Sequence, residues 1–267
     1  MLDSIAALPR SRPLLSVIVP AFNEERTVAH VVQVLSEIPL DMEIVVVDDC
    51  SIDKTPDILA ELSQIHKRLR VIRHQQNSGK TAAVRTGLAA TSGEIVIIQD
   101  ADMEQDPAEI PAIIQPIVDG KAKASFGSRF LTKEARRSMP FKQFFGNRCV
   151  TIFSNLISGL RLTDVETGYK AIRGEIFRRM ILTSSGFGLE VEIPAKLAKL
   201  RIPVHEVPVS YNARNYDAGK KIGVWDGVVA LWYVFKFNFL CRLGDSFRPE
   251  EQPRATPDFA MQRRSQD

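Results

Sequence analysis

Residues 95–107 read IVIIQDADMEQDP, an aliphatic run followed by acidic side chains at alternate positions. A short, continuous apolar run is typical of a strand buried on both faces of a sheet. If the backbone stays extended past the strand, Asp100, Asp102 and Glu104 project to one side. Crowded carboxylates repel one another unless a hard cation lies between them, so the stretch predicts a site for Mg²⁺ or Mn²⁺. The alternative is a solvated turn that leads into a helix at Pro107.

Similar apolar runs precede this one, at residues 14–19, 43–47 and 69–72. Amphipathic helical segments lie between them, beginning after Asn23, within 58–65 and near Ser78, and another follows Pro107. Alternating strands and helices predict an α/β fold in which helices cover both faces of a mostly parallel sheet. Ligands in such folds bind beyond the carboxyl ends of the strands. The polar residues expected at that edge are Asn23, Asp48, Asp49, Asp100 and Asp102.

The composition is that of an ordinary globular protein. The chain has 267 residues, 45% of them hydrophobic, and a net charge of +3, too small by itself to indicate nucleic-acid binding. Three widely spaced cysteines favour reduced thiols in a cytosolic setting over a disulfide framework, and Cys50 is interpreted as a packing residue. The first residues lack the pattern of a signal peptide, and no apolar run reaches the roughly 20 residues needed to span a bilayer.

The tetrad Ser78, Gly79, Lys80, Thr81 resembles the end of a phosphate-binding P-loop, but that motif requires glycine at the position of His74. A nucleotide hydrolase is therefore not expected. Lys80 at the start of a helix can meet an anion, with a solvated lysine as the alternative. The four histidines are scattered without the spacing of metal ligands and receive no predicted role.

An ordered set of motifs identifies a known family by resemblance. The strings are VIVPAFNEE, VVVDDCSIDKT, NSGKTAAVRTG, QDADMEQDP, GSRF, DVETGYKAIR, GFGLEVEI and PVSYNARNYDAGKKI. Together they resemble family 2 glycosyltransferases, and more narrowly the polyprenyl-phosphate sugar synthases of the dolichol-phosphate mannose type, over residues 14–243. The resemblance implies a GT-A fold. The expected divisions are a lead-in at 1–13, a catalytic domain at 14–224, an apolar helix at 225–246 and a disordered tail at 247–267.

The resemblance also implies roles for individual residues. The expected base and ribose contacts are Pro20, Phe22, Glu24, Val47 and Asp49. Asp100, Ala101 and Asp102 are expected at the donor diphosphate and its cation, with Asp102 among the catalytic residues. Glu104 becomes a further metal ligand, at a position where the mannose synthases usually carry glutamine. Arg214 and Lys220 match basic residues on a loop that closes over the diphosphate.

The chemistry of the acceptor leaves alternatives open. A polyprenyl phosphate is substantially dianionic at neutral pH, because its second pKa is about 6, and it attacks without a general base. A hydroxyl acceptor of a glycan or lipid needs a carboxylate base, and Glu190 and Glu192 share one side if their segment is extended. A protein that binds nucleotide sugars without catalysis is a further alternative.

Basic and aromatic residues interleave after residue 128. Arg129 matches a phosphate-binding and catalytic residue of the resembled branch, and Asn147 and Thr151 continue the acceptor site along a helix, with asparagine in place of the usual arginine. The neighbouring cations and rings are Phe130, Arg136, Arg137, Phe141, Lys142, Phe144 and Phe145. This pattern favours contact with a lipid interface, while the alternative is a surface loop leading into a buried helix.

The segment 225–243 is strongly apolar but interrupted by Lys236, Asn238 and Arg242. It predicts either an interfacial helix or a helix packed on the catalytic domain. The sequence as a whole predicts an inverting, metal-dependent sugar transferase, peripheral at the cytoplasmic face of a membrane. The donor base, the sugar and the oligomeric state are not predicted, because fold resemblance is a poor guide to substrate.

Overall fold

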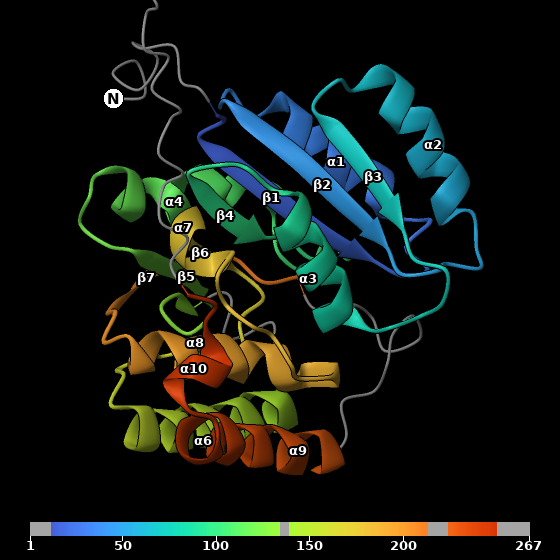
Figure 1. The fold of residues 1–267 in the computed structure, drawn as a ribbon. Coiled ribbons are helices and arrows are strands. Elements are labelled where there is room, and N and C mark those ends of the chain that lie inside the picture. Colours follow the sequence, from blue (N-terminus) through green and yellow to red (C-terminus); the bar gives the residue numbers. More distant parts are fainter. Residues whose placement is uncertain (1–11, 134–138, 213–223, 250–267) are drawn as a thin grey trace, which may run out of the picture.

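The computed structural model describes residues 12–133, 139–212 and 224–249. These residues form a seven-stranded sheet with the order β3-β2-β1-β4-β6-β5-β7 (Figure 1). The strands are β1 Leu15–Ala21, β2 Met42–Asp48, β3 Leu69–Arg73, β4 Ile95–Ile98, β5 Ala124–Ser128, β6 Lys170–Arg173 and β7 Val204–Pro208. The four apolar runs singled out in the sequence correspond to β1, β2, β3 and β4.

The sheet is mixed but mostly parallel, as the sequence predicted. Strands β3, β2, β1 and β4 pair in parallel, and β5 pairs in parallel with β7. Strand β6 lies between β4 and β5 and runs antiparallel to both. The chain order reverses between β1 and β4, where the connection through α3 Lys80–Ala90 returns to the centre of the sheet. A crevice at such a reversal is the usual ligand site of a doubly wound fold.

Helices cover both faces of the sheet, which confirms the predicted layers. On one face α1 Val28–Glu37, α2 Thr55–Ile65 and α4 Ile110–Val118 pack on aliphatic side chains of β1, β2 and β4. On the other face α3, α6 Phe141–Ser158 and α8 Leu189–Lys199 share a second core with Ile18, Val96 and Phe126. Shorter helical elements are η1 Pro107–Glu109, α7 Gly174–Phe177 and η2 Gly186–Gly188.

The first helix begins later than the sequence indicated. Helix α1 starts at Val28 with Thr27 in the N-cap position, and Asn23 lies outside the helix with φ 56°. The Asn23 Oδ1 accepts a hydrogen bond from the backbone of Ile52 at 2.9 Å. Asparagine tolerates this left-handed conformation, so Asn23 closes a turn at the end of β1 against the loop after β2.

The C-terminal apolar segment packs against α6 and α8. It forms α9 Val224–Phe235, the π-helix η3 Lys236–Leu240 and α10 Leu243–Ser246. Ala230, Val234 and Phe237 are buried in or against the core beside α8. Phe247 is also buried and bridges to Met180, so the residue at which the tail was expected to begin belongs to the folded part. Among the described residues, no helix has both the length and the apolar content required to cross a bilayer.

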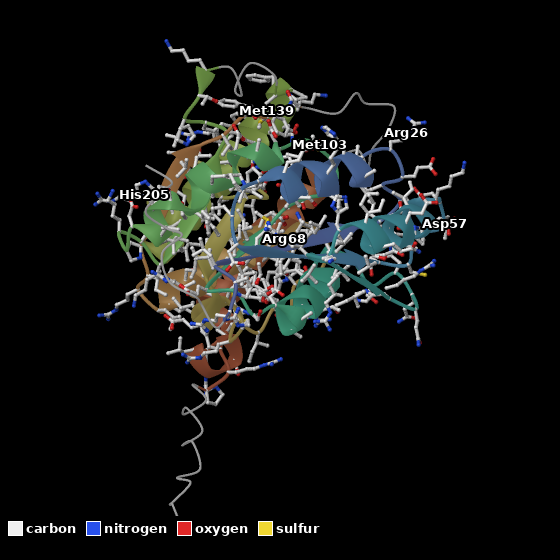
Figure 2. The ribbon with its side chains drawn as sticks, turned by 90° about the horizontal axis from the view of Figure 1, so that it is seen from above. Arg26, Asp57, Arg68, Met103, Met139 and His205 are labelled. Atoms are coloured by element: carbon white, nitrogen blue, oxygen red, sulfur yellow. The ribbon has the colours of Figure 1, made fainter. Side chains whose placement is uncertain are left out.

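Two views place these parts relative to one another. Figure 1 shows α6 and α9 side by side, on the far side of α8 from the sheet, while α2 lies at the opposite end of the molecule. Figure 2 places His205 of β7 and Asp57 of α2 at opposite sides, with Met103 between them. Met103 belongs to the turn that follows β4, so this turn lies near the middle of the row of strand ends.

Candidate active site

A cavity of about 310 Å³ opens at the carboxyl ends of β1, β2 and β4. Its lining residues are Pro20, Ala21, Phe22, Glu24, Asp49, Lys80, Ala83, Asp100, Ala101, Asp102, Glu104, Gln105, Arg129, Gln143, Asn147, Glu166, Gly168, Glu190 and Tyr211. Residues predicted for the base, the diphosphate and the acceptor regions therefore lie together at one site, although not every predicted residue is among them. The cavity lies where the order of the strands reverses, as expected for this fold.

The turn after β4 differs from the extended chain assumed in the sequence. Residues 101–105 form turns and bends, and Met103 has φ 60°. Side chains therefore do not alternate strictly between two sides here. The prediction that an extended backbone makes Asp100, Asp102 and Glu104 project to one side is wrong. The Asp102 Oδ1 accepts from the backbone of Glu104 at 3.1 Å, and the Glu104 Oε2 accepts from the Tyr211 hydroxyl at 3.3 Å.

These carboxylates still fit a divalent cation shared with a substrate. Among the described residues no three acidic, histidine or cysteine side chains are placed to hold a metal by themselves. Mg²⁺ in proteins is commonly held by one or two carboxylates together with substrate phosphates. A Cβ atom on Gly168 would collide with the Asp100 carboxylate, so the glycine preserves the space that this group occupies. Asp100 and Asp102 are thus the candidates to hold the cation beside a diphosphate.

Lys80 is held between two carboxylates in the cavity. Its Nζ lies 2.7 Å from Asp100 Oδ1 and 2.9 Å from Glu190 Oε1. Burial lowers the pKa of Lys80, but the attraction of Asp100 and Glu190 outweighs it and raises that pKa above its usual value. The solvated state considered for Lys80 in the sequence is therefore wrong, because 28% of the side chain is exposed and both its ion-pair partners line the cavity.

Asp49 connects the end of β2 to the start of α3. Its carboxylate accepts hydrogen bonds from the backbone of Ser78 at 2.9 Å and Gly79 at 2.6 Å. Its Oδ1 also lies 2.7 Å from His74 Nδ1, and the other ring nitrogen of His74 lies 2.8 Å from Thr86 Oγ1. His74, which had no predicted role, therefore orients a cavity residue.

Arg129 is buried and tightly paired. Its Nε and Nη2 donate to the two carboxylate oxygens of Asp164 at 2.6 and 2.8 Å, and its guanidinium lies 5.2 Å from the centre of the Tyr211 ring. When the Asn147 amide is oriented to satisfy its neighbours, its oxygen accepts from Arg129 Nη2 at 2.8 Å. In that orientation its nitrogen donates to Glu166 Oε2 at 2.5 Å.

Glu166 completes this wall of the cavity. Burial, followed by repulsion from the Glu190 carboxylate, raises the pKa of Glu166 to about 7, although Arg129 opposes the change. Glu190 also lines the cavity, and its Oε2 is buried without a hydrogen-bond partner. A buried carboxylate oxygen without a donor is uncommon and indicates a position where a ligand or water completes the contacts.

Three predicted residues lie away from the cavity. The segment expected to be extended forms α8, where residues two apart diverge by about 200°. Glu192 consequently points elsewhere: it accepts from the backbones of Thr183 and Ser184 and pairs with Lys196 at 2.6 Å. Thr151 accepts from the backbone of Val165 at 3.2 Å and supports a loop. The Val47 side chain is fully buried in a small apolar cluster.

Some predicted residues lie outside the described part of the chain, and some residues that line the cavity were not predicted. Arg136, Arg137, Arg214 and Lys220 lie outside the described residues. No role was predicted for Gln105, Gln143, Glu166 or Tyr211, all of which line the cavity. Glu166 and Tyr211 occur in quoted motifs, DVETGYKAIR and PVSYN, so the motifs themselves were the available signal. Gln143 had none, because its position depends on how α6 packs.

Comparisons with known proteins agree with the motifs. A family model described as "Glycosyl transferase family 2" matches residues 16–181. UDP-N-acetylglucosamine–dolichyl-phosphate N-acetylglucosaminyltransferase of Methanococcus voltae is 31% identical over 231 residues, 80% of this chain and 92% of that protein. Dolichol-phosphate mannosyltransferase of Pyrococcus furiosus is 30% identical over 215 residues, 78% of this chain and 59% of that protein.

Solved structures share the fold. Glucosyl-3-phosphoglycerate synthase from Mycobacterium tuberculosis, crystallised with Mn²⁺, UDP and glucosyl-3-phosphoglycerate, superposes with a TM-score of 0.61. It is 22% identical, and the match covers 85% of this chain and 78% of that one. At this identity the likeness concerns the arrangement of the elements, and it agrees with the mixed sheet described above.

Proposed function

Because the chain belongs to glycosyl transferase family 2, and is therefore a sugar-transferring enzyme, we propose that it transfers a sugar with inversion from a nucleotide donor to a polyprenyl phosphate. One observation carries the choice of acceptor. Helix α6 lines the cavity with Gln143 and Asn147, while it exposes Phe141, Phe145 and Leu156 on its surface. A single helix thus connects the reaction site with an apolar surface, as a lipid-linked acceptor requires. The two relatives named above, whose names include dolichyl or dolichol phosphate, support this choice.

The donor fits the other side of the cavity. Pro20, Phe22, Glu24 and Asp49 are proposed to contact the nucleoside, and Asp100, Ala101 and Asp102 the diphosphate. A divalent cation there, Mg²⁺ or Mn²⁺, supplies positive charge to the departing nucleoside diphosphate. The Mn²⁺ and UDP bound to the structural neighbour support this assignment. Arg214 and Lys220, outside the described residues, are proposed to add positive charge to the same group.

The chemistry of the acceptor determines which residues are needed. The oxygen of a phosphate dianion attacks the anomeric carbon as the bond to the nucleoside diphosphate breaks, so no proton has to be removed. The proposed residues on the acceptor side are Arg129 and Asn147, with Arg129 oriented by Asp164. Thr151 contributes indirectly, by holding the backbone of Val165.

A hydroxyl acceptor is the second candidate, and one observation favours it. Glu190 lines the cavity, and its buried Oε2 has no hydrogen-bond partner, so this carboxylate is the candidate to take a proton from an attacking hydroxyl. Glu192 is no longer a candidate for this base, because its two oxygens already accept from backbone amides and Lys196.

A matched pair of acceptors separates these candidates. The purified chain is incubated with radiolabelled UDP- and GDP-sugars and Mn²⁺, together with a short polyprenyl phosphate or the polyprenol of equal length. We expect label on the phosphate only, and none after EDTA treatment. Removal of a general base typically lowers the rate by about 10²- to 10⁴-fold. With a phosphate acceptor, Glu190→Gln should lower the rate of transfer by much less than this. Transfer only to hydroxyl acceptors, abolished by Glu190→Gln, would reject the phosphate acceptor.

Access to a lipid-linked acceptor is proposed to occur through peripheral contact with a bilayer. On α6 the exposed residues Phe141, Phe145, Ile152 and Leu156 recur at the spacing of one helical stripe. On α9 and η3 a second stripe contains Val228, Trp232, Phe235 and Phe239. The two helices lie side by side in Figure 1. We call these eight residues the apolar stripes.

The charges on the same helices select the kind of bilayer. The charged residues of α6 are Lys142 and Arg148, both basic, and Lys236 and Arg242 follow α9. Aromatic rings at the acyl boundary and cations at anionic headgroups are the usual contacts of an interfacial helix. The proposed partner is therefore a bilayer that contains anionic lipid.

Vesicle flotation tests this contact. The wild-type chain should bind vesicles of phosphatidylcholine with phosphatidylglycerol more strongly than vesicles of phosphatidylcholine alone. The double variant Phe141→Ser, Phe145→Ser should lose about tenfold or more in binding, because each buried ring contributes about 1.5–3 kcal/mol. Ile65→Ser on α2 is the matched control, since Ile65 is 71% exposed and lies outside the apolar stripes. Equal binding by the double variant and this control would reject the docking surface.

A further inference from the structure

Lys80 occupies an unusual position for a cation beside candidate metal ligands. It begins α3 and reaches across the cavity to Asp100 at the end of β4 and to Glu190 in α8. Its Nζ lies within 3.0 Å of both carboxylate oxygens of Asp100. Any cation that binds to Asp100 therefore has to share these oxygens with the ammonium group or to displace it.

The surroundings give the ammonium group a second place to bind. Its other partner is Glu190 Oε1 at 2.9 Å, while Glu190 Oε2 is buried and has no hydrogen-bond partner. A lysine ammonium has three donors, so a Lys80 that leaves Asp100 can use the vacant carboxylate oxygen of Glu190. The exchange keeps the ammonium group, whose side chain is only 28% exposed, paired with a carboxylate, which avoids the cost of leaving the charge without a partner.

We propose that Lys80 is a resident counter-ion that competes with the divalent cation for Asp100 and moves toward Glu190 when the cation binds with the donor diphosphate. This inference rests on the proposed function, since it concerns the same donor site. The diphosphate brings negative charge of its own, so the site then has to neutralise more charge than Lys80 alone can supply. Lys80 is thus a positioning residue, and it makes binding of the cation depend on the nucleotide.

The competition predicts a gain on removal of the lysine. Mn²⁺ binding is measured from the electron paramagnetic resonance signal of the free ion, using the full chain without sugar or acceptor. Lys80→Met should bind Mn²⁺ about fivefold more tightly or better, because two cations within a few ångströms repel each other. Addition of UDP or GDP should reduce this gain in affinity, since Lys80 of the wild-type protein then leaves Asp100.

Two further variants guard the interpretation. Lys80→Arg keeps the charge and should bind Mn²⁺ as weakly as wild type, which shows that the gain does not come from a disturbed fold. Lys121→Met removes an exposed lysine, 73% accessible and paired with Asp119 outside the cavity, and should leave Mn²⁺ binding unchanged. Thermal melting of each protein reports whether it is folded.

The outcomes separate the inference from the function on which it rests. Equal or weaker Mn²⁺ binding by Lys80→Met would overturn the competition and leave the proposed sugar transfer intact. In the Asp100→Asn background the gain should disappear. A gain that persists there in full would assign it to long-range repulsion and also overturn the inference. If neither wild type nor Lys80→Met binds Mn²⁺, with or without nucleotide, the metal is removed from the proposed function and the competition with it.

Discussion

Glu166 carries a carboxyl group whose proton affinity depends on folding. It is hydrogen-bonded through Asn147 to the Arg129 network, and burial with the nearby Glu190 raises its pKa to about 7. In the unfolded chain the same group has a pKa of about 4.3. Below the unfolded value both states are protonated. Between the two values the unfolded chain loses its proton first, so the folded state becomes less stable as the pH rises toward 7.

Replacement of Glu166 by glutamine should remove this pH dependence. We expect the free energy of unfolding of Glu166→Gln, minus that of wild type, to increase by about 1–3 kcal/mol between pH 5 and pH 8. Urea denaturation at both values, in EDTA, measures it. Effects of the substitution on packing cancel because they are present at both pH values. A difference that stays constant with pH would show that Glu166 titrates normally in the folded protein.

At this scale the sequence predicted residue types better than partners. Asp100, Asp102 and Glu104 could be placed beyond a strand because the apolar run ends there. Their orientation could not, since it depends on the left-handed Met103 in the following turn. Lys80 was undervalued for a related reason: its partner Glu190 is 110 positions away in the chain, and no local pattern reports such a contact.

Helix α8 contains two glutamates with different tasks in its first turn. Glu190 faces the cavity, whereas Glu192 is fully buried and pairs with Lys196. Loss of one partner from a buried ion pair typically costs about 3–5 kcal/mol, because the other charge stays buried. Glu192→Gln should therefore lower the free energy of unfolding by about that amount, measured in urea. Glu190→Gln should cost clearly less, since Lys80 keeps Asp100. Equal losses would contradict this division of roles.

The C-terminal segment offers a second comparison within one element. Phe237 is fully buried and stacks on Tyr233, whereas Phe239 is 62% exposed. Phe237→Ala should cost about 3–5 kcal/mol of stability, as large core truncations do. Phe239→Ala should cost less than about 0.5 kcal/mol, the usual range for surface positions, and instead weaken vesicle binding. Chemical denaturation and vesicle flotation on both variants measure the two effects, and a large stability loss for Phe239→Ala would show that this ring belongs to the core.

Element type was predictable where periodicity was strong and ambiguous where it was weak. Residues 189–192 alternate apolar and polar side chains, which favoured an extended segment, yet they form the first turn of α8, where tertiary packing buries all of them. For 225–243 the apolar content allowed packing or an interface. In the structure the same segment has both a buried side and an exposed side. Which residues lie on each side depends on the positions of α6 and α8, so it could not be predicted from the sequence.

For the whole molecule, the parallel half of the sheet was the predictable part. Strands β1, β2 and β4 are mostly buried, largely aliphatic runs of at least four residues, and short helical connections allow few arrangements. Strand β6 was not predicted, since it has only four residues and begins with Lys170, a buried lysine that donates to the backbone carbonyls of Val165 and Thr167. A lysine in a sequence normally indicates an exposed position. No local pattern therefore predicted the antiparallel strand at the centre of the sheet.

The cavity joins loops from both halves of the sheet, so a bound nucleotide should stabilise the fold as a whole. A ligand present at about 100 times its dissociation constant adds about 2.7 kcal/mol, which for a domain of this size raises the melting temperature by roughly 5–10 °C. We expect this increase for one nucleoside diphosphate with Mn²⁺ in a panel of UDP, GDP, CDP and ADP. Thermal melting with and without EDTA gives the part of the increase in melting temperature that is due to the cation. Asp102→Asn should lose this part and keep the rest of the increase. Equal shifts for all four nucleotides would mean that the cavity recognises the diphosphate alone, and the base contacts proposed for Pro20, Phe22 and Asp49 would then be wrong.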